Sequence, residues 1–494
     1  MSDGSGRSGL ARLLFEHPFG DDEPLISTID SSHTAGEVRE HAASTAEILR
    51  SSGVRPDTAV VVRLGNSERF VASMFGVWLA GAVLVPANPR QSASEIDHVL
   101  ATTRPAATID ESAMAITGGE THEYGPEVAF VTWTSGTTGA PKAILHTHGG
   151  YLELLDRVLG PLRGRPADPS RRPRPNLVPV SLALNAGIYN VLFGLRAGAS
   201  LVLMERFDTR QFSTLVERHS IRSTVLPPAA MVMLADDDRI SSLGPLKYVR
   251  SITAPLSPLA ARRFSEKFKV MVLNGYGQAE VGEVIGWTAQ DGRDHPEKIG
   301  AVGRPHPNVA IRIVDTSGTT VGADDVGELL VRPPRMTAGY ANSDSMDDRV
   351  DCDGFVHTGD LARQDEDGFV WIEGRLSDLI NRGGNKVFPD QVEEVLRLSP
   401  RVREAAVVGV PDERLGEVPV AFVVGDADDS ELVSLCREHL TPYKIPVDFV
   451  RLGELPHSEV GKVLRRQLAS DYASQAGRRP KAPASRFLPI VSSS

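Results

Sequence analysis

Residues 131–142 read Val-Thr-Trp-Thr-Ser-Gly-Thr-Thr-Gly-Ala-Pro-Lys, a stretch rich in hydroxyl groups that ends in a lysine. The apolar run at 128–131 predicts a buried strand, and we expect a helix after the lysine. Glycines let the backbone approach an anion, hydroxyl and N–H groups donate to its oxygens, and a lysine neutralises its charge. The stretch therefore predicts a phosphate-holding loop, although a surface turn rich in Ser, Thr and Gly has a similar composition.

The spacing inside this stretch separates it from the P-loop of common nucleotidases. A Walker-type loop places its lysine directly after the second glycine, followed by a Ser or Thr that holds magnesium. Here Ala140 and Pro141 precede the lysine, and Ala143 follows it. The order Thr-Ser-Gly-Thr-Thr-Gly-x-Pro-Lys instead resembles the signature loop of the adenylate-forming superfamily, which includes acyl-CoA synthetases, peptide-synthetase adenylation domains and beetle luciferases.

The resemblance implies a role for the residues of this loop. The phosphates of ATP would be held by Thr134, Ser135, Gly136, Thr137, Thr138, Gly139 and Lys142. Thr134 would also take part in catalysis, by contacting the α-phosphate as it reacts.

The bulk properties restrict the class of protein. A chain of 494 residues is too long for one core and predicts at least two domains. Apolar content of 41% and charged content of 24% are ordinary for a soluble globular protein. The formal net charge of -11 argues against nucleic acid as the main partner, but a small nucleotide responds to the local field of its site.

Cysteine content and apolar runs indicate the compartment. Cys352 and Cys436 cannot form a disulfide framework or a zinc site, so a reducing cytoplasm is the default expectation. Residues 1–9 are rich in Ser and Gly and lack the apolar centre of a signal peptide. Because no apolar run is long enough to span a bilayer, we expect a cytoplasmic protein without a membrane span.

Strand and helix patterns alternate between residues 57 and 273. A continuous apolar strand at 59–64 is followed by a helix at 69–79 with Asn66 as its expected N-cap, and Ser92 with Glu95 predicts a capping box for the next helix. Such alternation predicts an α/β fold with parallel sheets covered by helices. From residue 299 turn-rich alternation predicts a small antiparallel sheet or barrel-like subdomain.

The resemblance divides the chain into a large N-terminal domain of stacked α/β sheets and a small mobile α+β domain at the C-terminus. We expect the large adenylation domain at 1–374, a hinge at 375–377, the small domain at 378–470 and a flexible tail at 471–494. The hinge residue would be Ser377, where the family usually has Asp or Lys. A smaller residue should still swivel, but it lacks a charge that could favour one domain orientation.

A second motif is formed by residues 274–280, in which glycines allow a tight turn against a flat ligand, a tyrosine can stack and a carboxylate can hold a cation. A Gly-rich strand end explains the motif equally well when it is taken alone. The resemblance implies an adenine and acyl site made of Asn274, Gly275, Tyr276, Gly277 and Gln278, with Glu280 as catalytic magnesium ligand and Thr253, Ala254 and Pro255 as adenine wall. Ala279 stands where the family usually has a threonine that touches the α-phosphate, so Thr134 and Thr138 would carry more of that contact.

A third and a fourth motif complete the expected nucleotide site. Thr358-Gly359-Asp360 alone is more often a turn, but the resemblance implies that Asp360 and Arg375 hold the ribose. Lys462 alone is more often a solvated charge, but it aligns with the mobile catalytic lysine of the family. A cation delivered between a carboxylate and a phosphate would stabilise their crowded transition state.

Three further residues resemble the strand that lines the pantetheine tunnel of coenzyme A in related enzymes. These are Gly383, Gly384 and Lys386, and the resemblance places the lysine near the nucleotide.

The substrate pocket is predicted least directly. Ser181, Asn185 and Gly187 replace the aromatic and imidazole groups that are common in related enzymes, and Gly275 and Gly277 would face the same space. A pocket lined by them would be roomy and apolar and would suit a bulky ring system rather than acetate. Helix packing alone is an alternative reason for these small residues.

The motifs together predict an ATP-dependent acid ligase that forms an acyl adenylate, releases pyrophosphate and transfers the acyl group to coenzyme A, with ATP and Mg2+ as cofactors. Its partners would be a small carboxylic acid and coenzyme A. One alternative is an acyl-AMP ligase that passes the adenylate to an acyl carrier protein, an amine or a partner protein. Luciferase-type oxidation and a non-catalytic nucleotide-binding protein are further alternatives, and the oligomeric state stays open, with a homodimer among the options.

Overall fold

The computed structural model describes residues 9–134, 142–162, 172–252, 254–337, 339–341, 346–457 and 463–476. The chain divides into two compact units, Met1–Glu373 and Gly374–Ser494. Within the described ranges no helix is both long enough and apolar enough to cross a membrane.

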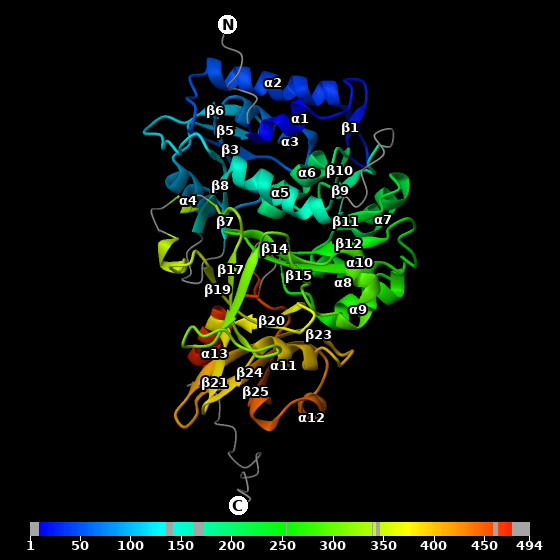
Figure 1. The fold of residues 1–494 in the computed structure, drawn as a ribbon, viewed down its shortest axis with the longest axis vertical. Coiled ribbons are helices and arrows are strands. Elements are labelled where there is room, and N and C mark those ends of the chain that lie inside the picture. The colour runs from blue at the N-terminus through cyan, green and yellow to red at the C-terminus, as the bar shows by residue number, and fades with distance from the viewer. Residues whose placement is uncertain are drawn as a thin grey trace, which may run out of the picture. The chain divides into compact units, whose positions relative to one another are not determined.

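The first unit contains two large sheets (Figure 1). The nine-stranded sheet has the order β15-β14-β13-β12-β11-β9-β10-β1-β2, with β1 (Pro24–Ser27), β2 (Ser32–Thr34), β9 (Asn176–Val178), β10 (Leu201–Leu203), β11 (Ser223–Val225), β12 (Tyr248–Ser251), β13 (Met271–Gln278), β14 (Gly282–Gly286) and β15 (Arg304–Pro305). The seven-stranded sheet has the order β18-β8-β7-β4-β3-β5-β6, with β3 (Ala59–Arg63), β4 (Val83–Pro86), β5 (Ala107–Asp110), β6 (Met114–Ile116), β7 (Val128–Thr134), β8 (Lys142–Thr147) and β18 (Gly339–Tyr340). The central strands of both sheets are parallel, as the alternating pattern predicts.

Helices pack against both faces of each sheet. The largest core cluster joins the two sheets through α1 (Arg12–Phe15), α2 (Ala35–Ser51), α3 (Glu68–Leu79), α5 (His148–Leu162) and α6 (Asn185–Arg196). The other face of the seven-stranded sheet packs against α4 (Ala93–Thr103), and that of the nine-stranded sheet against α7 (Thr209–Arg218), α8 (Pro228–Asp236) and α9 (Pro258–Phe268). This layered α/β arrangement confirms the predicted fold class.

Asn66 does not cap a helix. Ser67 is the N-cap of α3, and its hydroxyl accepts a bond from the N–H of Phe70. The side chain of Asn66 instead donates to the carbonyls of Val180 and Met204, at 2.7 and 2.9 Å, and accepts from the N–H of Leu182 at 2.8 Å. The predicted cap was therefore wrong by one residue, because Asn66 is held by the loops that follow β9 and β10. The capping box of Ser92 and Glu95 on α4 is confirmed.

The helix expected after Lys142 is a strand. β7 and β8 are antiparallel neighbours, and Thr134 lies directly opposite Lys142 in their register. The first turn of helix begins only at His148. Ala143 and Ile144 are fully buried between packed layers, and this burial favours an extended chain over a helix. The predicted phosphate loop thus joins two paired strands, and residues 135–141 lie outside the described part of the chain.

A four-stranded antiparallel sheet completes the first unit, in the order β16-β17-β19-β20, and confirms the small sheet predicted after residue 299. Its strands are β16 (Ala310–Val314), β17 (Gly327–Arg332), β19 (Val356–Gln364) and β20 (Val370–Arg375). β19 carries Thr358 and Asp360, so this sheet positions the predicted ribose site.

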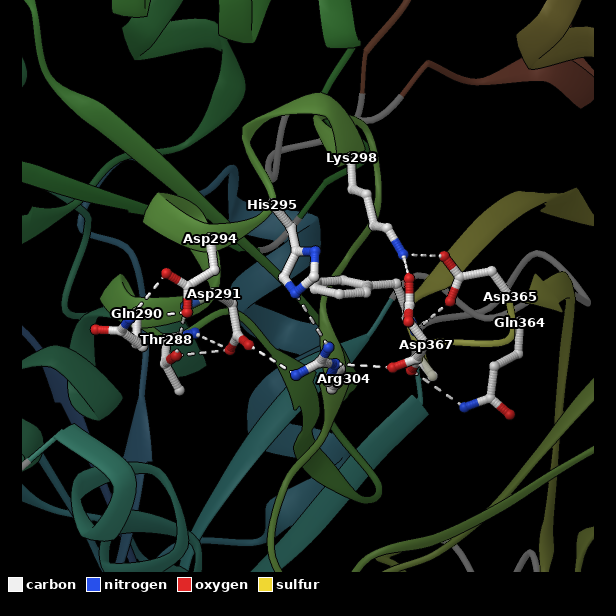
Figure 2. Close-up of polar contacts among 12 residues, drawn as sticks. Thr288, Gln290, Asp291, Asp294, His295, Lys298, Arg304, Gln364, Asp365 and Asp367 are labelled. Carbon is white, nitrogen blue, oxygen red and sulfur yellow. Dashed lines mark hydrogen bonds and ion pairs between the residues drawn. The ribbon is translucent and has the colours of Figure 1, made fainter.

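Figure 2 shows a polar network around the turn between β19 and β20. Lys298 donates to the carboxylates of Asp365, at 2.7 Å, and Asp367. Arg304 donates to the carbonyl of Asp367, at 3.0 Å, and to Asp291, which caps α10 (Ala289–Asp294). The two cations lie 4.7 and 4.3 Å from the ring centroid of Phe369. We call this set the outer cluster: Asp291, Lys298, Arg304, Asp365, Asp367 and Phe369.

The second unit is an α+β domain built on a five-stranded sheet. Its elements are β21 (Ile380–Arg382), β22 (Asn385–Val387), α11 (Pro389–Leu396), β23 (Val402–Asp412), β24 (Gly416–Gly425), α12 (Asp429–His439), β25 (Asp448–Arg451) and α13 (Arg465–Ala476). Separate core clusters join the sheet to α11 and α12 on one side and to Leu468 of α13 on the other. α13 continues to Ala476, past the boundary predicted at 470, and Tyr472 donates to Asp448 at 3.0 Å.

Candidate functional site

Asp360 lies at the centre of a partly buried hydrogen-bond network formed by strands of different sheets. Its Oδ2 accepts from the hydroxyl of Tyr276 at 2.6 Å and from Nε2 of Gln278 at 2.8 Å. Gln278 also donates to the carbonyl of Thr358 at 2.9 Å. Asp360 is 4% exposed, so its carboxylate is held in one position by neighbours from β13. The second and third sequence motifs are therefore joined directly.

Arg349 links this network to Glu280. Its guanidinium donates to Oε1 of Gln278 at 3.0 Å, to Oε1 of Glu280 at 3.1 Å and to the carbonyl of His357 at 2.9 Å. Burial alone would lower the pKa of Arg349, but Glu280 and the Tyr340 hydroxyl together outweigh it and the pKa is raised. Arg349 thus holds three groups of the predicted site, and the sequence analysis missed it.

Tyr340 is the second residue that the sequence analysis missed. Its hydroxyl donates to Oε1 of Glu280 at 3.0 Å, and burial raises its pKa. The ammonium of Lys142 lies 4.9 Å from the centre of the Tyr340 ring. β8 follows the predicted phosphate loop, and β18 pairs with it. Tyr340 on β18 therefore connects β8 to the carboxylate of Glu280 in the second motif.

The contacts of Glu280 allow a test of its predicted role as a magnesium ligand. Both bonds that it accepts fall on Oε1, so Oε2 can accept a further ligand. The described residues hold no group of three or more His, Cys, Asp and Glu side chains that could bind a metal. A single carboxylate fits Mg2+ in a nucleotide site, because the ion takes one or two carboxylates together with phosphate oxygens.

A small cavity lies beside Glu280. Asn185, at the start of α6, lines it together with Ala279 and Glu280, and accepts a bond from the Tyr151 hydroxyl at 2.8 Å. The remaining lining residues come from α5, β8 and two loops: His146, Thr147, Gly150, Tyr151, Leu154, Arg157, Val281, Gly282, Arg335, Met336 and Thr337. Ser181, Asn185 and Gly187 were predicted to line the substrate pocket. Of these three, Asn185 is among the described lining residues of this cavity, and Ser181 and Gly187 are not.

Ser181 and Gly187 contact each other. A Cβ atom at Gly187 would lie 2.1 Å from the carbonyl oxygen of Ser181, so this glycine permits a close turn at the start of α6. Gly277 is similar, because a Cβ there would lie 2.2 Å from the carbonyl of Gly282. Close backbone packing is therefore a sufficient reason for both glycines, and their role in the acid pocket stays a prediction.

A second, fully buried ionic cluster lies on the face of the nine-stranded sheet where Gly275 has no side chain. Glu283 pairs with Arg250 and accepts from Nε2 of His306 at 3.0 Å, while the Tyr189 hydroxyl lies 3.5 Å from its other oxygen. Burial alone would raise the pKa of Glu283, but Arg250 and His306 outweigh it and the pKa is lowered. We call these residues the inner cluster: Tyr189, Arg250, Glu283 and His306. The sequence analysis did not detect it, because its members are spread over 117 positions.

Other predicted residues of the first unit have separate surroundings. Asn274 pairs with Ser251 in the sheet and accepts a bond from the N–H of Gly275 at 3.1 Å. Ala254 is half-buried and Pro255 exposed in the loop between β12 and α9. The described part of the chain does not include the expected residues Ser135, Gly136, Thr137, Thr138, Gly139, Thr253 and Lys462, and gives only the backbone of Thr134.

The second unit holds the remaining predictions. Arg375 ends β20, and Ser377 is exposed in the following turn, where its hydroxyl donates to Asp378 at 2.9 Å. Gly383 and Gly384, with φ of 58° and 87°, form the two-residue turn between β21 and β22. Such a turn needs positive φ at both positions, which favours glycine. Lys386 is exposed on β22.

Comparison with known proteins gives the family. The model of the family described as AMP-binding enzyme matches residues 17–124 and 117–341, and that of the AMP-binding enzyme C-terminal domain matches residues 391–462. The chain is 31% identical to 4-coumarate–CoA ligase-like 9 of Oryza sativa subsp. japonica, over 89% of this chain and 88% of the relative. It is 30% identical to indoleacetate–CoA ligase of Aromatoleum aromaticum, over 85% and 89%.

A solved structure gives the same result for the fold. The amide bond synthetase McbA from Marinactinospora thermotolerans aligns with a TM-score of 0.81 and 26% identity, over 94% of this chain and 99% of that one. Two family models that together cover most of the chain, and a relative above 30% identity, agree with the linked motifs of the site. The chain therefore belongs to the AMP-binding enzyme family and is an enzyme of the acyl-CoA ligase branch of the adenylate-forming superfamily.

Proposed function

We propose that this enzyme activates a carboxylic acid with ATP, releases pyrophosphate and transfers the acyl group to coenzyme A. The observation that carries the proposal is the continuous chain of hydrogen bonds from Asp360 through Gln278 and Arg349 to Glu280. It holds a carboxylate suited to a ribose and a carboxylate suited to Mg2+ at fixed positions within one unit. Both are needed at once when a nucleotide is presented to an acid.

In the first half-reaction the acid carboxylate attacks the α-phosphate, and pyrophosphate leaves in line. Asp360 would accept bonds from the ribose hydroxyls, and Tyr276 would stack on the adenine between Gly275 and Gly277. Glu280 would hold Mg2+, which neutralises charge on the phosphates when it is bound. Lys142 and the hydroxyls at 134–138 would hold the leaving group, and Lys462 would stabilise the joined anions.

The second half-reaction assigns roles to the second unit. The unit would turn about Ser377, so that Lys462 leaves the adenylate and the strand with Gly383 and Gly384 guides the thiol of coenzyme A to the carbonyl. Arg375, which we place on the ribose, would stay close to the pivot. Hinge closures of this kind often limit turnover.

The acid that we propose is bulky and hydrophobic or aromatic. The names of two relatives support this proposal, since 4-coumarate and indoleacetate are both aromatic acids. The similarity to an amide bond synthetase favours a second candidate function, in which an amine takes the acyl group from the adenylate.

Pyrophosphate release over a panel of carboxylic acids, with and without coenzyme A, tests the proposal. We expect release with a bulky aromatic acid, faster turnover with coenzyme A, and a matching acyl-CoA product by mass spectrometry. Release without any thioester, together with amide formation when amines are added, would favour the second candidate. Asp360→Asn and Lys462→Ala should each reduce adenylation at least tenfold. Wild-type rates of adenylation in both variants would contradict the proposed site.

A further inference from the structure

The inner cluster contains hydrogen-bonding groups that the protein leaves unused. Arg250 is 9% exposed, yet its Nη1 has no acceptor among the described residues. On Glu283, Oε1 takes the bonds from Arg250 and His306, whereas Oε2 has the 3.5 Å contact with the Tyr189 hydroxyl. Buried polar groups are nearly always satisfied, so an unused donor beside a weakly bonded acceptor calls for a ligand or a water molecule.

The position of the cluster connects it to the predicted acid site. A Cβ at Gly275 would lie 3.2 Å from Oε1 of Glu283, and a Cβ at Gly286 would lie 2.8 Å from the same atom. These two glycines are cross-strand partners, and because neither has a side chain, the Glu283 carboxylate can lie directly against the backbone of Gly275. Gly275 is one of the residues proposed to line the acid site.

The cluster is also close to the cavity beside Glu280. Val281 and Gly282, which line the cavity, directly precede Glu283 in the chain. Tyr189 lies one helical turn after Asn185, another lining residue, on α6. The inner cluster therefore lies next to residues that line this cavity, both along the chain and along α6.

The charges of the cluster restrict what it can bind. Glu283 and Arg250 neutralise each other, and the nearby Arg157 is paired with Glu153 at 3.5 Å. A further full charge would be buried without a partner, which is strongly unfavourable. A neutral group that both donates and accepts has no such cost and satisfies the unused atoms.

We infer that the inner cluster recognises a neutral hydroxyl or N–H group on the acid, at the end remote from its carboxylate. Glu283 accepts from this group and Arg250 donates to it, while Tyr189 and His306 hold the carboxylate in place. The inference rests on the proposed acid-ligase function and names the substrate class of that site. A site built to bond such a group discriminates strongly against the analogue that lacks it, because its own polar atoms are then left unpaired.

The test uses pairs of acids of similar size and shape, of which one carries a neutral hydroxyl or N–H group and the other does not. Pyrophosphate release is measured with cinnamate and its 2-, 3- and 4-hydroxy forms, with 1-naphthaleneacetate and indole-3-acetate, with octanoate and 8-hydroxyoctanoate, and with 4-carboxycinnamate. We expect kcat/KM of the wild-type enzyme to be at least about tenfold higher for one hydroxyl or N–H member than for its unsubstituted partner. The charged 4-carboxycinnamate should be among the poorest substrates.

Two variants then assign the preference to the cluster. Glu283→Gln should reduce the ratio of kcat/KM within the preferred pair to about threefold or less, and Tyr189→Phe should reduce it partly without creating a buried charge. Asp365→Asn in the outer cluster is the matched control and should keep the wild-type ratio. A ratio does not depend on the fraction of active enzyme, so partial loss of folding does not imitate the expected result.

Each outcome separates this inference from the proposed function. Release with several acids but equal kcat/KM within every pair would overturn the inference alone, and would mean that the cluster holds only water. An unchanged ratio in both cluster variants would overturn it as well. No release with any acid, including acids outside the panel, would overturn the proposed function and this inference together.

Discussion

The two ionic clusters of the first unit use the same kinds of side chain but differ in how far their carboxylates reach water: the outer cluster includes one well-exposed carboxylate, Asp367, whereas that of Glu283 is buried. In the outer cluster, Lys298 bridges Asp365 and Asp367, and the side chain of Asp367 is 60% exposed. In the inner cluster, the side chains of Arg250 and Glu283 are 11% and 6% exposed. Figure 2 shows the outer charges paired on several sides, whereas Nη1 of Arg250 has no acceptor among the described residues.

The difference indicates separate purposes. Exposed ion pairs contribute little to stability, because water solvates the separated charges almost as well. Buried pairs pay a large desolvation cost, which apolar side chains of similar size would avoid. The inner cluster is both costly to bury and incompletely bonded, so ligand recognition explains it better than stability does. The outer cluster is better explained by its role in fixing the turn between β19 and β20.

The largest expected effect is loss of stability when the inner pair is broken. Glu283→Leu leaves Arg250 buried without a counter-charge, and we expect the free energy of unfolding to fall by about 3–5 kcal/mol. Urea unfolding followed by circular dichroism measures it. The double variant Glu283→Leu with Arg250→Met removes both charges and should recover most of the loss. A double variant no more stable than the single one would show that the charges are not the cause.

A smaller effect, on ATP binding, is expected at Arg349. Its side chain is 31% exposed, a value between those of Glu283 and Asp367. Arg349→Met removes the donor shared by Gln278 and Glu280, and we expect KM for ATP to rise about tenfold, or about 1.4 kcal/mol. Arg349→Lys keeps the charge without the planar guanidinium, so its KM for ATP should lie between those of the wild type and Arg349→Met. The matched control is Arg312→Met, which breaks the exposed pair with Asp353 and should leave KM unchanged. Equal effects of the two Met variants would contradict the role of Arg349.

The two clusters should differ in how salt changes their contribution to stability at acid pH. The pKa of Glu283 is lowered because Arg250 and His306 outweigh burial, and that of Asp367 is lowered by its bond to Lys298. A carboxyl whose pKa is lower in the folded state stabilises the fold above its unfolded pKa, near 4.5 for Glu283, and loses this contribution as pH falls through the folded pKa.

The measurement is the free energy of unfolding between about pH 6 and pH 3, in low salt and in about 1 M NaCl. The part of the slope that Glu283→Gln removes should persist in high salt, because the pair is buried. The part that Asp367→Asn removes should disappear there. A Glu283 contribution that high salt abolishes would mean that water reaches the inner cluster freely.

The smallest expected effect is that of Asp367→Asn at neutral pH. Lys298 keeps its bond to Asp365, so the midpoint of urea unfolding should shift only slightly at physiological salt and not at all in high salt. Asp365→Asn, whose carboxylate is 14% exposed, should shift it more. A larger shift for Asp367→Asn would show that the exposed pair is the stronger one.

The sequence was sufficient where chemistry lies in neighbouring residues. Tyr276 and Gln278 alternate on one strand, Asp360 follows Thr358 on another, and the structure joins these two motifs by hydrogen bonds, while their role in binding a nucleotide stays a prediction. Arg349 and Tyr340 were missed because they reach Glu280 from 69 and 60 positions away, and no local pattern marks such a contact.

The remaining differences have the same origin in tertiary contacts. Asn66 and Ser67 are both favourable N-cap residues. Ser67 caps α3 because the side chain of Asn66 is hydrogen-bonded to carbonyls of distant loops. Gly187 was predicted to leave space for the acid, with packing as the alternative; the structure shows a turn there that closes on Ser181, and the role in the acid pocket stays a prediction. A strand follows the phosphate loop because its residues are buried between layers, which the hydroxyl-rich sequence does not reveal.

The three bonds of Asn66 have a consequence for chemical ageing. Its amide nitrogen faces two carbonyl oxygens, and its amide oxygen faces an N–H group. Deamidation would turn the nitrogen into an oxygen and set it against both carbonyls, so the covalent lesion would also loosen the joint between the β3–α3 loop and the nine-stranded sheet. Because Asn66 is 8% exposed, the same bonds that make the lesion harmful also shield the amide from hydrolysis. Deamidation of Asn66 should therefore be slow, because it requires a local opening that breaks these three hydrogen bonds.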